Sequence, residues 1–91
     1  MPLLSDEEIE SRLGALDGWS REGDAIAKAF KREKFTGSVE FVNELLPVAE
    51  ELDHHPDLAV SWDTVTVTIS THSEGGLTES DFELAGRIDA L

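Results

Sequence analysis

Apolar residues recur every three or four positions in three stretches of the chain, a spacing typical of amphipathic helices with one buried face. The first stripe consists of Ile9, Leu13 and Leu16. Ser5 and Glu8 have the spacing of a capping box. This helix is therefore expected to begin after Ser5 and to end at Asp17-Gly18.

The second helical stretch is longer and contains a proline. Its stripe consists of Phe41, Leu45, Val48 and Leu52, with Val42, Leu46 and Ala49 beside it. Thr36 is the expected N-cap. The helix is expected to run to about His54, because Pro56 pushes the residue before it out of the helical region. Pro47 removes the hydrogen bond to the carbonyl of Asn43, which predicts a kink.

The third helical stretch closes the chain. Its stripe consists of Leu84, Ala85, Ile88 and Leu91. Thr78 and Asp81 are spaced as a capping box, with Leu77 and Phe82 flanking them as a hydrophobic staple. We therefore expect the helix to start at Thr78, after a break at Gly75-Gly76.

Elsewhere apolar and polar residues alternate, which is typical of half-buried strands. The clearest run spans 64–71, where Val65, Val67 and Ile69 alternate with threonine and serine. His72 continues the polar side of this run. The other expected strands cover 19–21, 25–33 and 58–62, with turns at 22–24 and around Asp63.

These elements occur in the order α-β-β-α-β-β-α. Strand pairs joined by short hairpins predict a four-stranded antiparallel sheet with three helices packed on one face, so the fold class is α+β. A chain of 91 residues is long enough for one domain, which we expect to cover residues 1–91. Because so small a domain has a thin core, association with further copies would be a natural supplement.

Charge narrows the choice of partners. The net charge is −13, from 20 acidic and 7 basic residues. From Leu46 onward, Arg87 is the sole base against ten acids. Such a field repels nucleic acids and anionic membranes, so neither is an expected partner. A solvated, solubility-promoting surface and adaptation to a salt-rich cytoplasm both fit this charge.

Cysteine is absent, which excludes disulfides, thiolate nucleophiles and cysteine-ligated metals. The N-terminal stretch is acidic and has no long apolar run, so neither a signal peptide nor a membrane span is expected. Both features favour a cytoplasmic protein. Trp19 and Trp62 are expected to anchor the core or an interface, although either could form a stacking wall for a flat heterocycle.

The candidate chemistry lies with histidine. All three histidines, His54, His55 and His72, fall between positions 54 and 72, where the second helix and the last strand are expected to end. Ends of rigid elements present side chains to clefts. If the helix persists, Glu50 lies one turn before His54. A nearby carboxylate favours the protonated imidazole, which suits a general acid near neutral pH.

Two other interpretations stay open at this point. Each histidine could be only a surface or capping group. Three histidines could also ligate zinc, but adjacent His54 and His55 would point apart if one ends a helix and the next is extended. Neither a glycine-rich phosphate loop nor a G-x-S-x-G elbow is present. A small basic patch, formed by Lys28, Lys31, Arg32 and Lys34, is interpreted as a solvated strand edge.

Three runs of the sequence resemble the pterin-4a-carbinolamine dehydratase family. They are E-E-L-D-H-H-P-D at 50–57, T-V-T-V-T-I-S-T-H at 64–72 and G-L-T-E-S-D-F at 76–82. The resemblance extends to Gly18-Trp19 and Asp24-Ala25-Ile26, and so covers nearly the whole chain.

The resemblance implies a hydro-lyase with the fold expected above, assembled as a homodimer or homotetramer. The implied reaction is dehydration of a 4a-hydroxytetrahydropterin to the quinonoid dihydropterin in tetrahydrobiopterin regeneration. It requires neither a cofactor nor a metal, because imidazoles can move the protons. The alternative is a non-catalytic pterin-binding or protein-assembly module of the same fold.

Site roles follow from the same resemblance. Catalytic roles fall to His54, His55 and His72. Substrate-binding roles fall to Glu50, Asp53, Pro56, Ser70, Thr71, Ser73 and Asp81. Within these sets, His54 and His72 would form the acid/base pair, and Asp81 would also stabilise the loop after His72. Two departures bear on the site: Ser80 stands where animal members carry an arginine, and Pro47 interrupts the helix that presents His54.

Overall fold

A computed structural model describes residues 2–91. In chain order the elements are α1 (Asp6–Gly14), β1 (Ser20–Glu22), β2 (Ala25–Lys31), α2 (Lys34–Leu52), β3 (Asp57–Ser61), β4 (Thr64–Ile69), the short 3-10 turn η1 (His72–Glu74) and α3 (Glu79–Asp89). The order α-β-β-α-β-β-α and the α+β class predicted from the sequence are confirmed. None of the described helices is both long and apolar enough to cross a bilayer.

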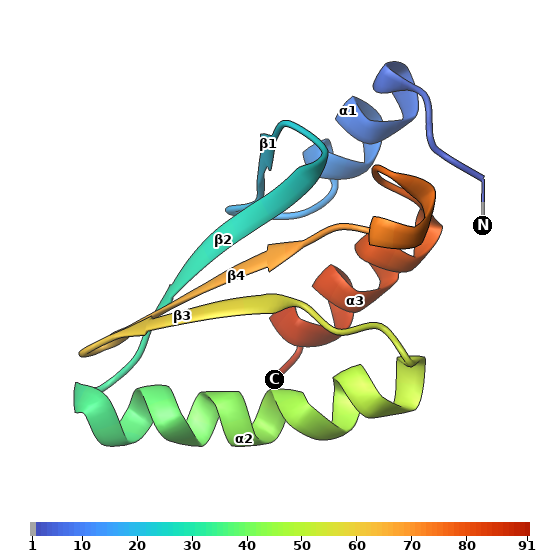
Figure 1. The fold of residues 1–91 in the computed structure, drawn as a ribbon. Helices are drawn as coiled ribbons and strands as arrows, with labels where there is room; N and C mark the ends of the chain where they lie inside the picture. The colour runs from blue at the N-terminus through green and yellow to red at the C-terminus, as the bar shows by residue number, and fades with distance from the viewer. Residues whose placement is uncertain (1) are drawn as a thin grey trace.

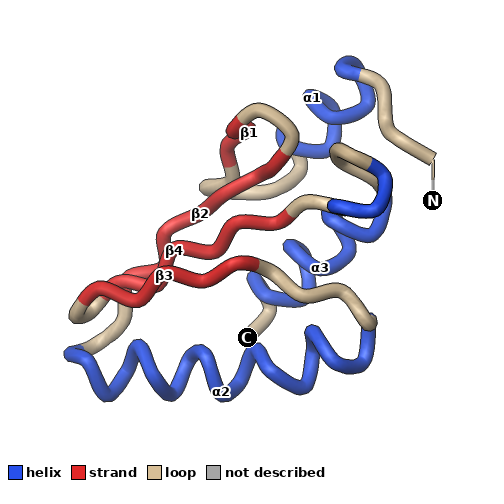
Figure 2. Tube along the Cα trace, in the orientation of Figure 1, coloured by secondary structure: helices blue, strands red, loops and turns tan. Residues whose placement is uncertain are grey.

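The four strands form one antiparallel sheet in the order β1-β2-β4-β3. Figure 1 shows this sheet running diagonally, with α1 near its upper end, α3 to its right and α2 below it. Figure 2 shows that the loops after α2 and after β4 lie at the same end of the molecule. That end therefore brings together two segments that are distant in sequence.

The core lies between the sheet and the helices. The inward side of β4 carries Val65, Val67 and Ile69, all with 0% exposure, and Ile26 and Phe30 of β2 lie opposite Ile69 and Val65. Burying one such aliphatic side chain is worth about 1.5–3 kcal/mol. The helices contribute Ile9, Phe41, Leu45, Val48, Leu84, Ala85 and Ile88. The alternation read from residues 64–71 thus identified the central strand.

Both predicted capping boxes are present. The Ser5 hydroxyl accepts from the Glu8 amide at 3.2 Å, and the Ser5 amide donates to a Glu8 carboxylate oxygen at 3.0 Å. Thr78 and Asp81 form the corresponding box at the start of α3. Side chains thus satisfy backbone amides at the first turn of each helix.

The longest helix differs from its prediction at both ends. α2 begins at Lys34, with Glu33 as N-cap, rather than after Thr36, and it ends at Leu52 rather than near His54. Lys34 has a φ of 61°, in the left-handed region. The chain therefore turns into the helix two residues before the predicted N-cap, Thr36. The helix continues past Pro47, which is exposed. Water can satisfy the carbonyl that proline leaves without a donor.

Smaller differences affect the first helix, the strand ends and the C-terminus. α1 ends at Gly14 rather than at Asp17-Gly18. β2 stops at Lys31 rather than at residue 33, where the Arg32 amide donates to the Asp63 carbonyl at 2.6 Å and closes the loop. α3 ends at Asp89, so Leu91, placed in the buried stripe by its spacing, is 43% exposed. β1 and β3 are each shifted by one residue, to 20–22 and 57–61, while β4 ends at Ile69 rather than Thr71.

Candidate active site

The end of α2 positions His54 through its backbone. Asp53 adopts the left-handed conformation (φ 51°, ψ 42°), its amide donates to the Glu50 carbonyl at 3.2 Å, and the His54 amide donates to the Ala49 carbonyl at 3.1 Å. This pair of bonds is a Schellman motif. It turns the chain out of the helix at Asp53, one residue earlier than the influence of Pro56 alone suggested.

The imidazole of His54 binds a buried carboxylate on another helix. Its Nε2 lies 2.6 Å from Asp81 Oδ1. The His54 side chain is 15% exposed and that of Asp81 is 0% exposed. Because little water reaches this pair, it is more rigid than a surface ion pair.

The second oxygen of Asp81 is also occupied. Asp81 Oδ2 accepts from the Thr71 hydroxyl at 2.8 Å and from the Thr78 amide at 2.8 Å. The two threonine hydroxyls lie 2.9 Å apart. One carboxylate therefore joins the end of α2, the end of β4 and the first turn of α3.

The segment after β4 forms a small closed loop. Thr71 pairs with Gly76 in an isolated bridge, and the Thr71 carbonyl accepts from the amides of Glu74 and Gly75, each at 3.0 Å. Gly75 has a φ of 74°, a conformation that favours glycine. The prediction that His72 continues the strand is wrong, because these bonds curl the chain into η1.

His72 lies at the start of η1 and is exposed. Across residues 2–91, its side chain makes no hydrogen bond or ion pair. Ser73 is exposed beside it, and Ser70 is half-buried at the end of β4. These three side chains lie on the same segment as Thr71 and remain accessible from solvent.

His55 forms a second histidine–carboxylate pair. Its Nε2 lies 2.6 Å from Glu50 Oε2, with side-chain exposures of 55% and 63%. Helical spacing suggested that Glu50 would lie near His54, but the early end of α2 brings it to His55 instead. Pro56 follows, half-buried, and leads into β3.

The structure therefore brings the candidate residues together in two groups. His54, Thr71 and Asp81 are in direct contact, and His55 contacts Glu50. Thr78 belongs to the first group but was read from the sequence only as a helix cap. The capping-box spacing was a signal for Thr78, since an acid that caps a helix with one carboxylate oxygen can bind another side chain with the second. Within residues 2–91, no group of three or more histidine and acidic side chains is arranged to hold a metal ion.

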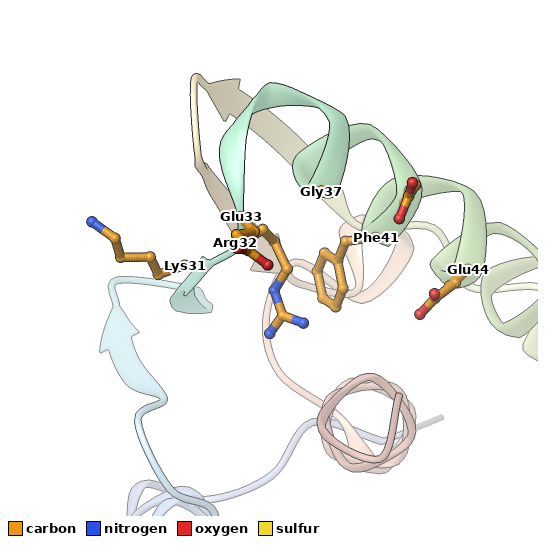
Figure 3. A pocket seen from close by; sticks show the side chains of 7 residues that line it. Lys31, Arg32, Glu33, Gly37, Phe41 and Glu44 are labelled. Atoms are coloured by element: carbon orange, nitrogen blue, oxygen red, sulfur yellow. The ribbon is translucent and has the colours of Figure 1, made fainter.

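A hollow lies elsewhere, at the first turns of α2. It has a volume of about 440 Å³ and contains the Arg32 guanidinium, 4.5 Å from the centre of the Phe41 ring (Figure 3). Of the other bases in the predicted patch, Lys31 also lines this hollow and pairs with Asp63, whereas Lys28 pairs with Asp89. The basic patch is thus dispersed into separate contacts.

Fold and site together define an α+β domain with histidine–carboxylate pairs clustered at one end of the sheet. The chain belongs to the pterin 4 alpha carbinolamine dehydratase family, whose model matches residues 2–91.

Relatives from other organisms match over nearly their full length. A candidate pterin-4-alpha-carbinolamine dehydratase of Sulfolobus acidocaldarius is 51% identical over 88 residues, covering 97% of each chain. One from Roseiflexus castenholzii is 47% identical, covering 98% of this chain and 96% of its own. A crystal structure from Brucella melitensis, described as a transcriptional coactivator/pterin dehydratase, has a TM-score of 0.93 at 37% identity, over 98% of this chain and 97% of its own.

Proposed function

We propose that this protein dehydrates a 4a-hydroxytetrahydropterin to the quinonoid dihydropterin and water, in tetrahydrobiopterin regeneration. The observation that carries the proposal is the buried His54–Asp81 pair in a chain of the dehydratase family. A histidine held by a carboxylate can both accept and deliver a proton near neutral pH.

The reaction needs two proton movements and one bond cleavage. The carbon–oxygen bond breaks as a proton reaches the leaving hydroxyl, while the neighbouring ring nitrogen forms a double bond to that carbon and loses its proton. Proton transfer by positioned side chains contributes about 10²–10⁴-fold to such rates. In the proposed mechanism, His54 and His72 exchange these protons, and no covalent intermediate forms.

The remaining candidate residues are proposed to hold the pterin. His55, oriented by Glu50, and Pro56 would contact the ring from one side. The segment after β4 offers hydroxyls and backbone groups at Ser70 and Ser73. These roles are supported by exposure, since these side chains are open or half-open to solvent at the same end of the sheet as His54.

A coupled hydroxylase assay tests the proposal. Wild-type protein should accelerate the decay of the 4a-hydroxypterin, and a His54→Ala, His72→Ala double variant should lose that acceleration. Asp24→Asn, an exposed change in the β1–β2 turn, is the matched control and should retain full activity. Wild-type rates no better than those of the double variant would refute the dehydratase proposal.

We also propose that the chain assembles as a homodimer or homotetramer. β3 is an edge strand, and all five of its residues are exposed. Its neighbourhood exposes the apolar side chains of Leu58, Val60 and Trp62, and α2 exposes those of Phe35, Val39 and Leu46. An open, apolar edge favours pairing with another chain. In a chain of net charge −13, β3 carries only one charged residue, Asp57, so charge repulsion between two paired β3 strands would be small.

Light scattering at low and high protein concentration tests this assembly. Wild-type protein should have the mass of two or four chains, and Val60→Lys should lower it. A wild-type mass of one chain at high concentration would contradict the proposal.

An assembly module that does not turn over pterin is the second candidate. The observation in its favour is the same exposed apolar edge, together with the coactivator description of the Brucella melitensis relative. Titration with a reduced pterin separates the two functions. Absence of both binding and turnover would favour the assembly module.

A further inference from the structure

We infer that Asp81 is a positioning residue that fixes the tautomer of His54, with the proton on Nε2, so that His54 acts on the substrate through Nδ1. The inference rests on the proposed function for its catalytic part. The placement of the proton itself follows from the hydrogen bonds around Asp81. The first step is therefore to determine which atoms donate and which accept.

Two backbone amides fix the direction of the bonds around Thr78. The Ser80 amide can only donate, so Thr78 Oγ1, 3.3 Å away, is its acceptor. The Thr78 amide can only donate, so Asp81 Oδ2 accepts from it at 2.8 Å. Asp81 also lies in the first turn of α3, where the helix dipole favours a negative charge.

The hydroxyls of Thr71 and Thr78 can then be oriented in only one way that gives each hydroxyl proton an acceptor. Among residues 2–91, Thr71 Oγ1 at 2.9 Å is the only acceptor within hydrogen-bond distance of Thr78 Oγ1, so the Thr78 hydroxyl donates to Thr71. The Thr71 hydroxyl consequently donates to Asp81 Oδ2 at 2.8 Å. The reverse arrangement would leave the Thr78 proton unpaired in a side chain with 0% exposure.

Asp81 Oδ2 therefore accepts two hydrogen bonds, and an ionised carboxylate accepts at its other oxygen as well. Its Oδ1 lies 2.6 Å from His54 Nε2, so that nitrogen carries the proton. Nδ1 has no hydrogen-bond partner among residues 2–91 and keeps its lone pair. Since the His54 side chain is 15% exposed, Nδ1 is the ring atom left to take up and return a proton.

The burial of Asp81 shows whether it can contact the substrate directly. With 0% exposure and both oxygens occupied, the carboxylate cannot reach a bound pterin. It acts on the substrate only through His54. The Glu50–His55 pair provides the contrast, because exposures of 63% and 55% leave that histidine free to change partner and tautomer in water.

Replacing one oxygen of Asp81 by an amide should reverse the tautomer. In Asp81→Asn, the donors at Thr71 and Thr78 require the amide oxygen on their side, which leaves the NH₂ group facing His54. Nε2 must then accept, and the proton moves to Nδ1. A histidine in the wrong tautomer keeps its position but loses its base function, so kcat should fall about 10²–10⁴-fold with little change in KM.

Nitrogen-15 NMR of histidine-labelled protein without substrate tests the placement of the proton. Wild-type His54 should show a protonated Nε2 and a bare Nδ1, Asp81→Asn should show the reverse, and the exposed Asp24→Asn control should match wild type. A protonated Nδ1 in neutral wild-type His54 would overturn the inference. Because the wild-type spectrum decides, the test stands even if Asp81→Asn fails to fold.

Thr71→Val offers a second variant that keeps the carboxylate and the α3 cap. His54 should retain the Nε2 proton, because the Thr78 amide still binds Asp81 Oδ2. A reversed tautomer in this variant would refute the role assigned to Asp81. If the spectra are as expected but wild-type protein does not dehydrate the pterin, the tautomer assignment holds and the proposed function fails.

Discussion

The indole N–H of Trp19 donates to Asp89 Oδ2 at 3.0 Å, although the two residues are 70 positions apart in the sequence. Asp89 Oδ1 lies 2.8 Å from Lys28 Nζ, so one carboxylate joins the start of the sheet to the last turn of α3. Trp19 is 6% exposed, and its N–H has little access to water. The contact therefore ties the two ends of the fold together.

Loss of this acceptor should lower stability. Asp89→Ala leaves a nearly buried indole N–H unpaired, and we expect the free energy of unfolding to fall by about 1–3 kcal/mol in urea titrations. Asp89→Asn keeps an acceptor for Trp19 and is the matched control, with a smaller loss. Equal losses in both variants would assign the effect to the Lys28 charge rather than to the indole.

The left-handed turn at Asp53 makes a second prediction. Asp53→Val should destabilise the protein by about 1–2 kcal/mol, because a branched side chain fits this conformation poorly. Asp53→Gly should fold with near-normal stability, since glycine adopts positive φ readily. The folded glycine variant should nevertheless show a raised KM, as expected for a substrate-binding residue. An unchanged KM would leave Asp53 with a purely conformational role.

Acid sensitivity is predicted at the first capping box. The amide and hydroxyl of Ser5, with the Arg12 charge, lower the pKa of Glu8 below its usual value. A carboxyl whose pKa is lowered by folding contributes stability above its unfolded pKa and loses it as the pH falls through the folded value. The urea midpoint of wild type should therefore exceed that of Glu8→Gln at pH 7, and the two should converge as the pH falls through the lowered pKa of Glu8.

The control for this comparison is Glu10→Gln, an exposed change outside the capping box. It should leave the urea midpoint at pH 7 near the wild-type value. A gap between the urea midpoints of wild type and Glu8→Gln that does not narrow as the pH falls would mean that the shape of the side chain, not its charge, causes the difference.

The exposed pair of Glu50 and His55 is expected to affect substrate binding more than stability. Glu50→Gln should change the free energy of unfolding by less than about 1 kcal/mol, because surface ion pairs contribute little. If Glu50 orients His55 against the pterin, the variant should raise KM severalfold and leave kcat nearly unchanged. A fall in kcat as large as that of His54→Ala would move the proton-transfer role to His55.

The fold was largely predictable from local patterns. Alternation at Val65, Val67 and Ile69 defined the central strand, and both capping boxes marked the starts of their helices. These signals are strong because each depends on residues within a few positions of one another. The errors lie at element ends such as Lys34 and Asp53, where left-handed residues other than glycine start and stop α2.

The site was predictable only in part. Sequence and resemblance together named His54, Thr71 and Asp81, but not the bonds between them. The His54–Asp81 contact spans 27 positions and depends on how α3 docks beside the end of α2, which no local spacing encodes. The direction of each hydrogen bond around Asp81 also depends on the backbone amides of Thr78 and Ser80. A backbone amide does not depend on the type of residue, so the sequence gives no signal for these bonds.

The double use of Asp81 has a consequence for the order of events during folding. The same carboxylate caps α3 and binds His54, so the histidine acquires its partner only after the last helix has docked. A chain still lacking its C-terminal helix would carry every histidine but would leave His54 without its carboxylate partner. Fraying of the first turn of α3, measurable as amide exchange at Thr78, would then interrupt activity without any change at the reacting groups.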